Sequence, residues 1–139
     1  MATVTKNLKE GASAPLTHIG GHKMVAENLL DFSATGFNVA GSDVVQALII
    51  PAGAIVTSVT CEVRTAEGGV ATINIGDTAD VDGWDAAVNA NAAAGLIVGD
   101  GAYAGGKRYA SESTIDVIPS ADLDAAVIYI SAEYYIAEL

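Results

Sequence analysis

The sequence predicts an all-β protein built as an antiparallel β-sandwich or barrel. Residues 54–65 alternate apolar and polar side chains, and so do residues 125–139. A period of two is typical of strands with one buried side and one side facing solvent. Seven or eight strand-like segments are separated by turns rich in Gly and Pro, and at most one short helix is expected. Many short strands joined by such turns favour a sandwich or a barrel.

The predicted strands of the first half begin at Met24. The segment “MVAENLLDF” alternates, and “DVVQALII” is an apolar run, stopped by “PAG”, that favours a strand covered on both faces. In “AIVTSVTCEVRT” every second residue is expected to face the core, namely Ile55, Thr57, Val59, Cys61 and Val63. The next strand, “VATINIGD”, follows an “EGG” turn, which predicts a hairpin between these two strands.

The second half mixes an Ala- and Gly-rich segment with further strands. “DAAVNANAAAG”, from Asp85 to Gly95, is compatible with one short helix capped by its final glycine, and “LIV” after it is expected to be a short strand. “STIDVIPS” predicts a strand with Ile115 and Val117 on one face. In the last strand the residues expected to face inward are Ile128, Ile130, Ala132, Tyr134 and Ile136. Its opposite face carries Val127, Tyr129, Ser131, Glu133 and Tyr135.

The charge is distributed unevenly along the 139 residues, which are expected to form one domain. Residues 1–23 carry three lysines against one glutamate, whereas the rest of the chain holds three basic and sixteen acidic residues. We therefore expect an extended N-terminal arm over residues 1–23 and a single β-sandwich domain over residues 24–139. The acidic domain should repel phosphate backbones, so no nucleic-acid partner is predicted.

The sequence also indicates where the protein is made. No apolar run reaches the roughly 18 residues of a membrane-spanning helix, so no membrane partner is predicted. The N-terminal “MATVTKNLKEG” lacks the apolar centre of a signal peptide, and synthesis as a soluble protein in a cytoplasm is expected. The single cysteine, Cys61, rules out a disulfide within the chain and is predicted to be a buried thiol.

The stretch “NIGDTADVDGWDAA” is the best candidate for a site with its own chemistry. It holds four carboxylates, Asp77, Asp80, Asp82 and Asp85. Placing Gly83 at the glycine position of an EF-hand leaves Thr78 and Asn89 where the first and last acidic ligands belong. The favoured interpretation is a surface turn in which aspartates bind nearby backbone N–H groups and Trp84 folds onto the sandwich.

This stretch has two other interpretations. A calcium site using Asp77, Asp80 and Asp82 together with backbone carbonyls stays open, and no other cofactor is predicted. Catalysis by a pair of carboxylates needs a cleft and neighbours that separate the two pKa values. Because no His, Lys or aromatic cluster is expected beside these acids, the chain is predicted not to be an enzyme.

The tyrosines of the last strand suggest a contact between subunits. Tyr129 and Tyr135 are expected on the outward face, and tyrosine is favoured at interfaces because it buries a large area while keeping a polar tip. The alternative is ordinary cross-strand pairing on an exposed sheet.

The order of features over residues 44–135 resembles a known family. An apolar strand leads through “PAG” to a long alternating strand, and then to “IGD”, “DVDGW”, an Ala- and Gly-rich excursion, “TIDV” and a final strand. This order is similar to that of the capsid decoration proteins of tailed bacteriophages, also called cement or auxiliary head proteins. The resemblance implies a jelly-roll-like β-sandwich that forms homotrimers on the outside of the shell, bridges major capsid protein subunits and carries no catalytic residues.

The expected function is therefore that of a structural virion protein on the outer capsid surface. In the arm, the residues expected to contact the shell are Lys6, Leu8, Lys9, Leu16 and Ile19. The residues expected at the trimer interface are Tyr129, Glu133 and Tyr135. The alternative function is a recognition module of a phage fibre or other appendage that binds a receptor or carbohydrate, calcium-dependent if the aspartates hold an ion. That alternative needs Trp84 to be exposed as an aromatic platform.

Overall fold

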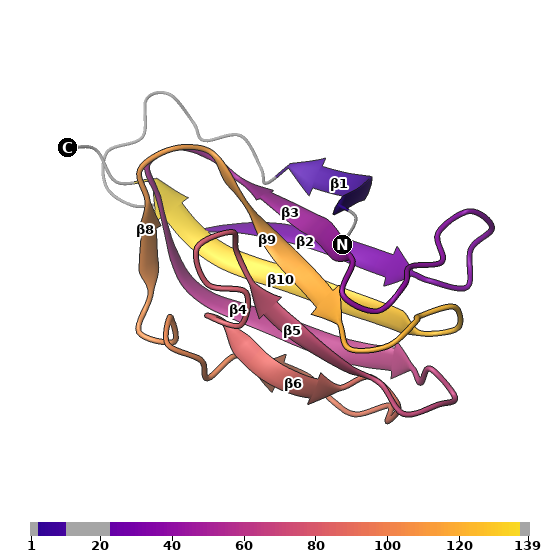
Figure 1. Ribbon diagram of the computed structural model, residues 1–139. Coiled ribbons are helices and arrows are strands. Elements are labelled where there is room, and N and C mark those ends of the chain that lie inside the picture. The colour runs from indigo at the N-terminus through magenta and orange to yellow at the C-terminus, as the bar shows by residue number, and fades with distance from the viewer. Residues whose placement is uncertain (1–2, 11–22, 137–139) are drawn as a thin grey trace.

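The computed structural model describes residues 3–10 and 23–136, with side chains at Thr3 and from Lys23 onward. Within these ranges the chain forms ten strands and no helix (Figure 1), so no described helix could cross a membrane. The strands are β1 (Thr3–Glu10), β2 (Met24–Asp31), β3 (Val44–Ile50), β4 (Ala54–Thr65), β5 (Thr72–Gly76), β6 (Asp85–Asn89), β7 (Ile97–Val98), β8 (Lys107–Tyr109), β9 (Ser113–Pro119) and β10 (Val127–Ile136).

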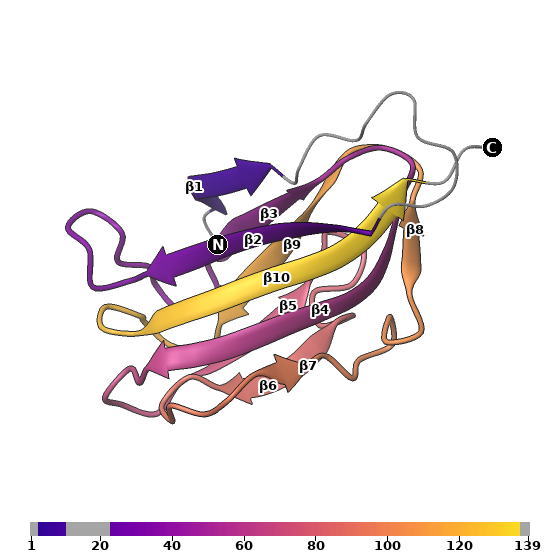
Figure 2. The same ribbon diagram turned by 180° about the vertical axis from the view of Figure 1, so that it is seen from behind.

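The strands form two facing sheets, which confirms the predicted β-sandwich. Sheet A has the order β1-β3-β9-β5-β6, and sheet B, in front in Figure 2, has the order β2-β10-β4-β7, with β8 also paired to β4. The antiparallel pairs are nested along the chain: β2 with β10, β3 with β9, β4 with β7 and β8, and β5 with β6. Such nesting of a rolled-up double chain is the topology of a jelly roll.

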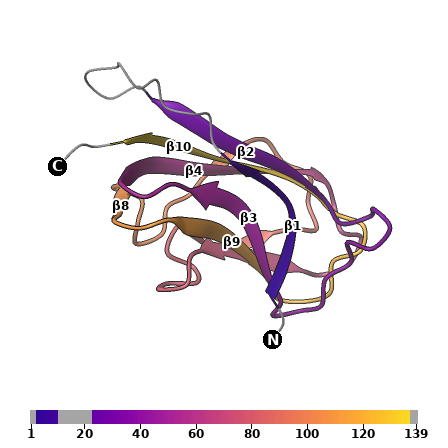
Figure 3. The ribbon, with the colours of Figure 1, turned by 90° about the horizontal axis from the view of Figure 1, so that it is seen from above.

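β1 adds a strand to this jelly roll from within the predicted arm. It pairs in parallel with β3, from Thr3 beside Val44 to Glu10 beside Ile49. Figure 3 shows β1 along the side of the sandwich, between β3 of sheet A and β2 of sheet B. The register is irregular between Thr5 and Lys9. Residues 3–10 therefore have the backbone of an edge strand.

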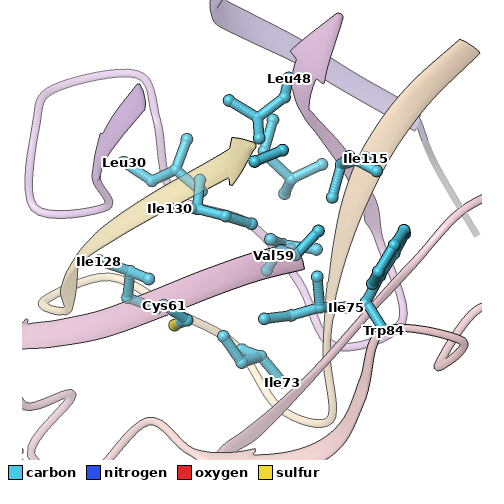
Figure 4. Packing of buried hydrophobic residues seen from close by; sticks show 14 of the residues in the cluster. Leu30, Leu48, Val59, Cys61, Ile73, Ile75, Trp84, Ile115, Ile128 and Ile130 are labelled. Carbon is cyan, nitrogen blue, oxygen red and sulfur yellow. The ribbon is translucent and has the colours of Figure 1, made fainter. Parts of the chain in front are cut away.

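The core lies between the sheets, where branched aliphatic side chains from both layers meet (Figure 4). The predicted inward row of β10 is confirmed for Ile128, Ile130, Ala132 and Tyr134, whose exposed fractions are 1% or less. From sheet A the side chains of Leu48, Ile73, Ile75 and Ile115 are equally buried. Cys61 is a buried free thiol, as predicted, and burial raises its pKa to about 12.

β4 carries a β-bulge at Thr57, which has no partner between two consecutive pairs with β10. A bulge shifts the alternation of side chains by one residue. Ala54 and Val56, before the bulge, are therefore buried. The inward direction predicted for Ile55 and Thr57 is wrong, because both are only half-buried. Beyond the bulge the predicted inward residues are confirmed, namely Val59, Cys61 and Val63.

Two sequence-based expectations about the connections are wrong. β4 and β5 do not form a hairpin, because β4 belongs to sheet B and β5 to sheet A, and the loop between them passes from one sheet to the other. The segment from Asp85 begins with strand β6 rather than a helix. β6 pairs with β5, and Asn74 accepts a hydrogen bond from the backbone N–H of Ala87 at 2.9 Å. Pairing along this sheet edge outweighs the helix propensity of the alanines. The short strand predicted at “LIV” is confirmed as β7.

Glu67 lies in the loop that connects β4 of sheet B with β5 of sheet A. Its side chain binds this loop to the turn before β10. Its carboxylate accepts hydrogen bonds from the backbone N–H groups of Asp124, Ala125 and Ala126, at 3.0 to 3.2 Å. Burial alone raises the pKa of Glu67, but these N–H donors outweigh it and lower the pKa. The charged carboxylate therefore stabilises the folded state.

We expect the substitution Glu67→Ala to lower the free energy of unfolding by about 1 to 2 kcal/mol, because three donors lose a charged acceptor at a partly exposed site. Glu67→Gln keeps one acceptor oxygen and should lose less. Because the folded-state pKa is lowered, the contribution is present at neutral pH and disappears as the pH falls through that pKa. Urea unfolding at neutral and acidic pH measures both effects. Equal stability of wild type and the alanine variant at neutral pH would contradict this role.

Candidate functional site

The aspartate-rich loop after β5 is the turn that the sequence predicts. Oδ1 of Asp77 accepts hydrogen bonds from the backbone N–H groups of Ala79 at 2.9 Å and Asp80 at 3.0 Å. The N–H of Asp77 in turn donates to the carbonyl of Asp80 at 2.9 Å. Trp84, at the end of the loop, is fully buried. Both parts of the favoured interpretation, the aspartate-stabilised turn and the anchoring tryptophan, are confirmed.

The surroundings of Asp77 differ from the expectation. Its Oδ2 lies 2.6 Å from Nζ of Lys107 and accepts a hydrogen bond from the hydroxyl of Tyr109 at 2.9 Å. The hydroxyl of Tyr103 lies 2.9 Å from Lys107 Nζ, and the indole N–H of Trp84 donates to Tyr109 at 3.1 Å. The expectation that no Lys or aromatic cluster stands beside the acids is therefore wrong. These partners come from residues 103–109, far away in the sequence.

This cluster is an ion pair whose charges are satisfied by the chain itself. Burial alone raises the pKa of Asp77, but the bonds from Lys107 and Tyr109 outweigh it and lower that pKa. Burial alone lowers the pKa of Lys107, but its contacts with Asp77 and Tyr103 raise it. Both groups therefore stay charged at neutral pH. Asp77 follows β5 of sheet A and Lys107 begins β8 of sheet B, so the pair joins the two sheets.

The same geometry argues against a calcium site in the loop and against a sugar-binding role for Trp84. The carboxylate of Asp77 is 2% exposed and already binds an ammonium group. Among the side chains that the structure describes, at Thr3 and from Lys23 to Ile136, no group of three His, Cys, Asp or Glu could hold a metal ion. Trp84 is buried, with the ring of Tyr103 against it edge-on at 5.5 Å between centroids. It therefore offers no exposed platform for a sugar ring.

A second buried acid lies next to this cluster. Asp116 of β9 is 1% exposed, sits beside Gly76 in the sheet register, and accepts a hydrogen bond from the hydroxyl of Thr114 at 2.6 Å. Burial raises its pKa, the bond from Thr114 opposes this, and the charge of Asp77 adds to the rise, which reaches about 6. No sequence motif marks Asp116, because it stands in an otherwise ordinary strand.

The outer side of sheet B carries the three residues predicted for a subunit interface. Tyr129, Glu133 and Tyr135 lie on the outward side of β10, each half-buried by its neighbours. The hydroxyl of Tyr129 donates to the carboxylate of Glu27 on β2 at 2.9 Å. The carboxylate of Glu133 lies 3.7 Å from Nζ of Lys23. The three residues therefore share one face of the molecule, as their alternation indicated.

A shallow depression of about 330 Å³ opens on this face. It is lined by Glu27, Asn28, Leu29, Arg64 and Tyr129, and we call it the β2–β10 depression. The guanidinium carbon of Arg64 lies 4.8 Å from the centroid of the Tyr129 ring, a cation–π contact. Nε of Arg64 also donates to Glu62 at 2.7 Å.

Exposed aliphatic side chains surround the predicted residues, and these were missed in the sequence. Val25 and Leu29 of β2 are exposed on the outer side, opposite Glu133 and Tyr129 in the register. Val98 of β7 is exposed at the other edge of the sheet. The alternation of “MVAENLLD” was the available signal, since its outward row contains a valine and a leucine. The outer side of sheet A shows no exposed large apolar side chain among the residues described there.

The predicted shell contacts of the arm fall largely outside these observations. Lys6, Leu8 and Lys9 lie in β1, of which the backbone alone is described at these positions. Leu16 and Ile19 lie outside the described residues.

No family model and no curated protein matches the sequence, whereas solved structures do. A chain of the cyanophage Pam1 capsid asymmetric unit has a TM-score of 0.66 at 19% identity, covering 91% of this chain and 93% of that one. A chain of the capsid of Ralstonia phage GP4 has a TM-score of 0.71 at 15% identity, covering 99% and 100%. A chain of the acidic stable capsid of Helicobacter pylori bacteriophage KHP30 has a TM-score of 0.59 at 13% identity, covering 84% and 89%. The resemblance to phage capsid-associated proteins is therefore confirmed at the level of the fold.

We expect Lys107→Met to lower the free energy of unfolding by about 3 kcal/mol, because it leaves the buried carboxylate of Asp77 without its counter-ion. The double variant Asp77→Asn/Lys107→Met should lose less, since it leaves no unpaired charge. Arg108→Met removes an exposed cation from the same strand and should change stability by less than about 0.5 kcal/mol. Chemical unfolding of the three variants measures this. A Lys107→Met variant no less stable than Arg108→Met would refute the role of the pair.

We also expect Asp116 to make stability fall as the pH rises. Below pH 3.8 the carboxyl is protonated in both states, whereas between 3.8 and about 6 only the folded state keeps the proton. Over this pH range the free energy of unfolding should fall by at most about 3 kcal/mol. The substitution Asp116→Asn should restore that loss at pH 7. The difference in melting temperature between Asp116→Asn and wild type, followed from pH 4 to 7, measures this. A difference that does not grow with pH would contradict it.

Proposed function

We propose that this chain is a non-enzymatic structural protein of a bacteriophage virion. The observation that carries the proposal is the structural match to chains from three phage capsids, each of which covers most of this chain. The cluster of ionisable groups around the buried Asp77 supports the same conclusion. Its charges are paired within the chain, so it serves stability rather than a reaction.

We place the protein on the outside of the shell, where it bridges neighbouring major capsid protein subunits. A protein that binds only the assembled shell stabilises that state by mass action. Packaged DNA presses outward on the shell, and a clamp across subunit boundaries raises the free energy needed to separate them. A net charge of −11 suits a body that faces solvent.

Two surfaces are proposed for contacts. The N-terminal arm, with Lys6, Leu8, Lys9, Leu16 and Ile19, provides the shell contact. The outer face of sheet B, with Tyr129, Glu133 and Tyr135, provides the contact within a homotrimer. In support, the three trimer residues lie on one face next to exposed Val25 and Leu29, and interfaces are enriched in aromatic residues. The arm carries the opposite charge to the domain.

The decisive experiment adds the purified protein to expanded phage shells that lack it, followed by co-sedimentation. We expect saturable binding and shells that withstand a higher temperature before they break. Protein that stays in the supernatant at every concentration would overturn the proposed function.

We expect the double variant Lys6→Glu/Lys9→Glu to bind these shells at least tenfold more weakly, because it reverses the charge of the proposed contact segment. The loss should be greatest at low ionic strength, where screening is weakest. Arg108→Glu, on the exposed side of β8, is the matched control and should bind like wild type. Equal binding of wild type and the double variant in low salt would remove the arm from the contact.

A further inference from the structure

β1, the edge strand of sheet A, has a bulge in its middle. Between Thr5 and Lys9, which both pair with β3, three residues stand opposite Ala47 alone. A regular ladder has a single residue at such a position. The three residues therefore leave the ladder, while the strand on either side of them stays paired. We call this segment, residues 6–8, the β1 bulge.

The hydrogen bonding of Ala47 accounts for the bulge. Ala47 is fully buried and has no partner in β9, because the register of that pair also shifts there. Its carbonyl accepts a hydrogen bond from Nδ2 of Asn28, on β2 of the other sheet, at 3.0 Å. A buried carbonyl needs a partner, and Asn28 provides one in place of β1. β1 therefore passes Ala47 without leaving this carbonyl unpaired.

The bulge lies on the lateral side of the sandwich, where β1 runs between β3 and β2 (Figure 3). In the part of the chain that the structure describes, no strand pairs with the other edge of β1. Bulges are frequent at sheet edges and beside binding sites, because they redirect the residues that they contain. A bulge with a lysine also hinders the addition of a further strand. This edge therefore suits a contact made by the bulged residues rather than by strand pairing.

The charge of the segment indicates the kind of partner. From residue 24 onward the chain holds sixteen acidic and three basic residues, whereas Lys6 and Lys9 lie within and directly after the bulge. An acidic surface is attracted to this segment and repelled by the rest of the molecule. Most of the basic side chains that the structure describes already pair with carboxylates of the same chain, namely Lys23, Arg64 and Lys107.

The pairing of β1 with β3 favours binding by the docked strand. A free arm loses conformational entropy when a partner orders it. A strand that is already paired has lost that entropy on folding. Because β1 is paired on both sides of the bulge, the ends of the bulge are fixed before any partner binds. The contact therefore gains affinity if β1 stays on β3.

We propose that the β1 bulge makes the shell contact while β1 stays paired with β3, and that it binds an acidic surface of the major capsid protein. This inference rests on the proposed function and adds to it the state in which the arm binds. Residues 3–10 then belong to the folded body during binding, and the bulge is a preformed contact.

A disulfide that fixes β1 on β3 provides the first test. Thr5 and Gln46 are paired, and neighbouring strands lie about 4.8 Å apart, within the range that a disulfide spans. Thr5→Cys/Gln46→Cys should therefore form a link within one chain under mild oxidation. Cys61 does not interfere, because it is 1% exposed and its thiol stays protonated.

The oxidised and reduced forms of this variant should bind expanded shells with equal affinity. Binding that is about tenfold or more weaker in the oxidised form would mean that β1 has to leave β3, which refutes the proposal. A link between two chains, or the absence of a link, would contradict the pairing on which the proposal depends. Mass spectrometry and gels without reductant distinguish these products.

Removing the bulge while keeping both lysines is the second test. Deletion of Asn7 and Leu8 leaves one residue opposite Ala47. Deletion of Ala12 and Ser13, beyond the end of β1, shortens the chain equally and leaves the bulge, so it is the matched control. We expect the bulge deletion to bind shells about tenfold more weakly than the control, with an equal melting temperature. Equal shell binding of the two deletion variants would rule out the bulge as the contact.

The same binding assay separates this proposal from the proposed function. Wild type that does not bind shells would refute both. Weak binding of Lys6→Glu/Lys9→Glu together with full binding of the bulge deletion would keep the arm as the contact and refute the role of the bulge.

Discussion

The structure depends above all on the burial of one apolar row along β10. This strand is the centre of sheet B, paired along its length with β2 on one side and β4 on the other. Its inward side chains face those of β3, β5 and β9 across the core. Because burial of apolar surface drives the sheets together, the direction of this row fixes which residues of β2 and β4 also face inward. The outer row of the same strand is thereby set toward solvent or a partner.

Two acidic residues that lie outside the strands connect distant segments of the chain. Glu67 binds three backbone N–H groups of the turn before β10, and Asp77 binds Lys107 at the start of β8. The Asp77–Lys107 pair links two sheets that the strand ladders do not connect, whereas Glu67 extends the β4–β10 pairing beyond its last pair, Thr65 with Val127. The acidic residues therefore have two roles. A few carboxylates form hydrogen bonds or ion pairs within the chain, while most remain on the surface and repel other copies.

The strands could be predicted from the sequence because alternation reports local geometry. The inward rows of β9 and β10 followed directly from period two, and the turn at Asp77 followed from the chemistry of aspartate. The bulge at Thr57 could not be predicted, since a threonine within a β-rich run carries no sign of a missing partner. Neither could the Asp77–Lys107 pair, which joins residues thirty positions apart through the fold. The short strand at “LIV” was predicted, but the exposure of Leu96 and Val98 was not, because it depends on the pairing of β7 with β4.

The nested pairing of the jelly roll has a consequence for how the chain folds. β2 finds its partner only when β10 is available, about a hundred residues later in the chain. Non-local pairs of this kind make folding slow, because the entropy of closing long loops is lost before the contacts form. During that interval the unpaired edges of β2 and β3 are open to other chains. Where many copies are made at once, mutual repulsion between acidic chains protects these edges until the last strand arrives.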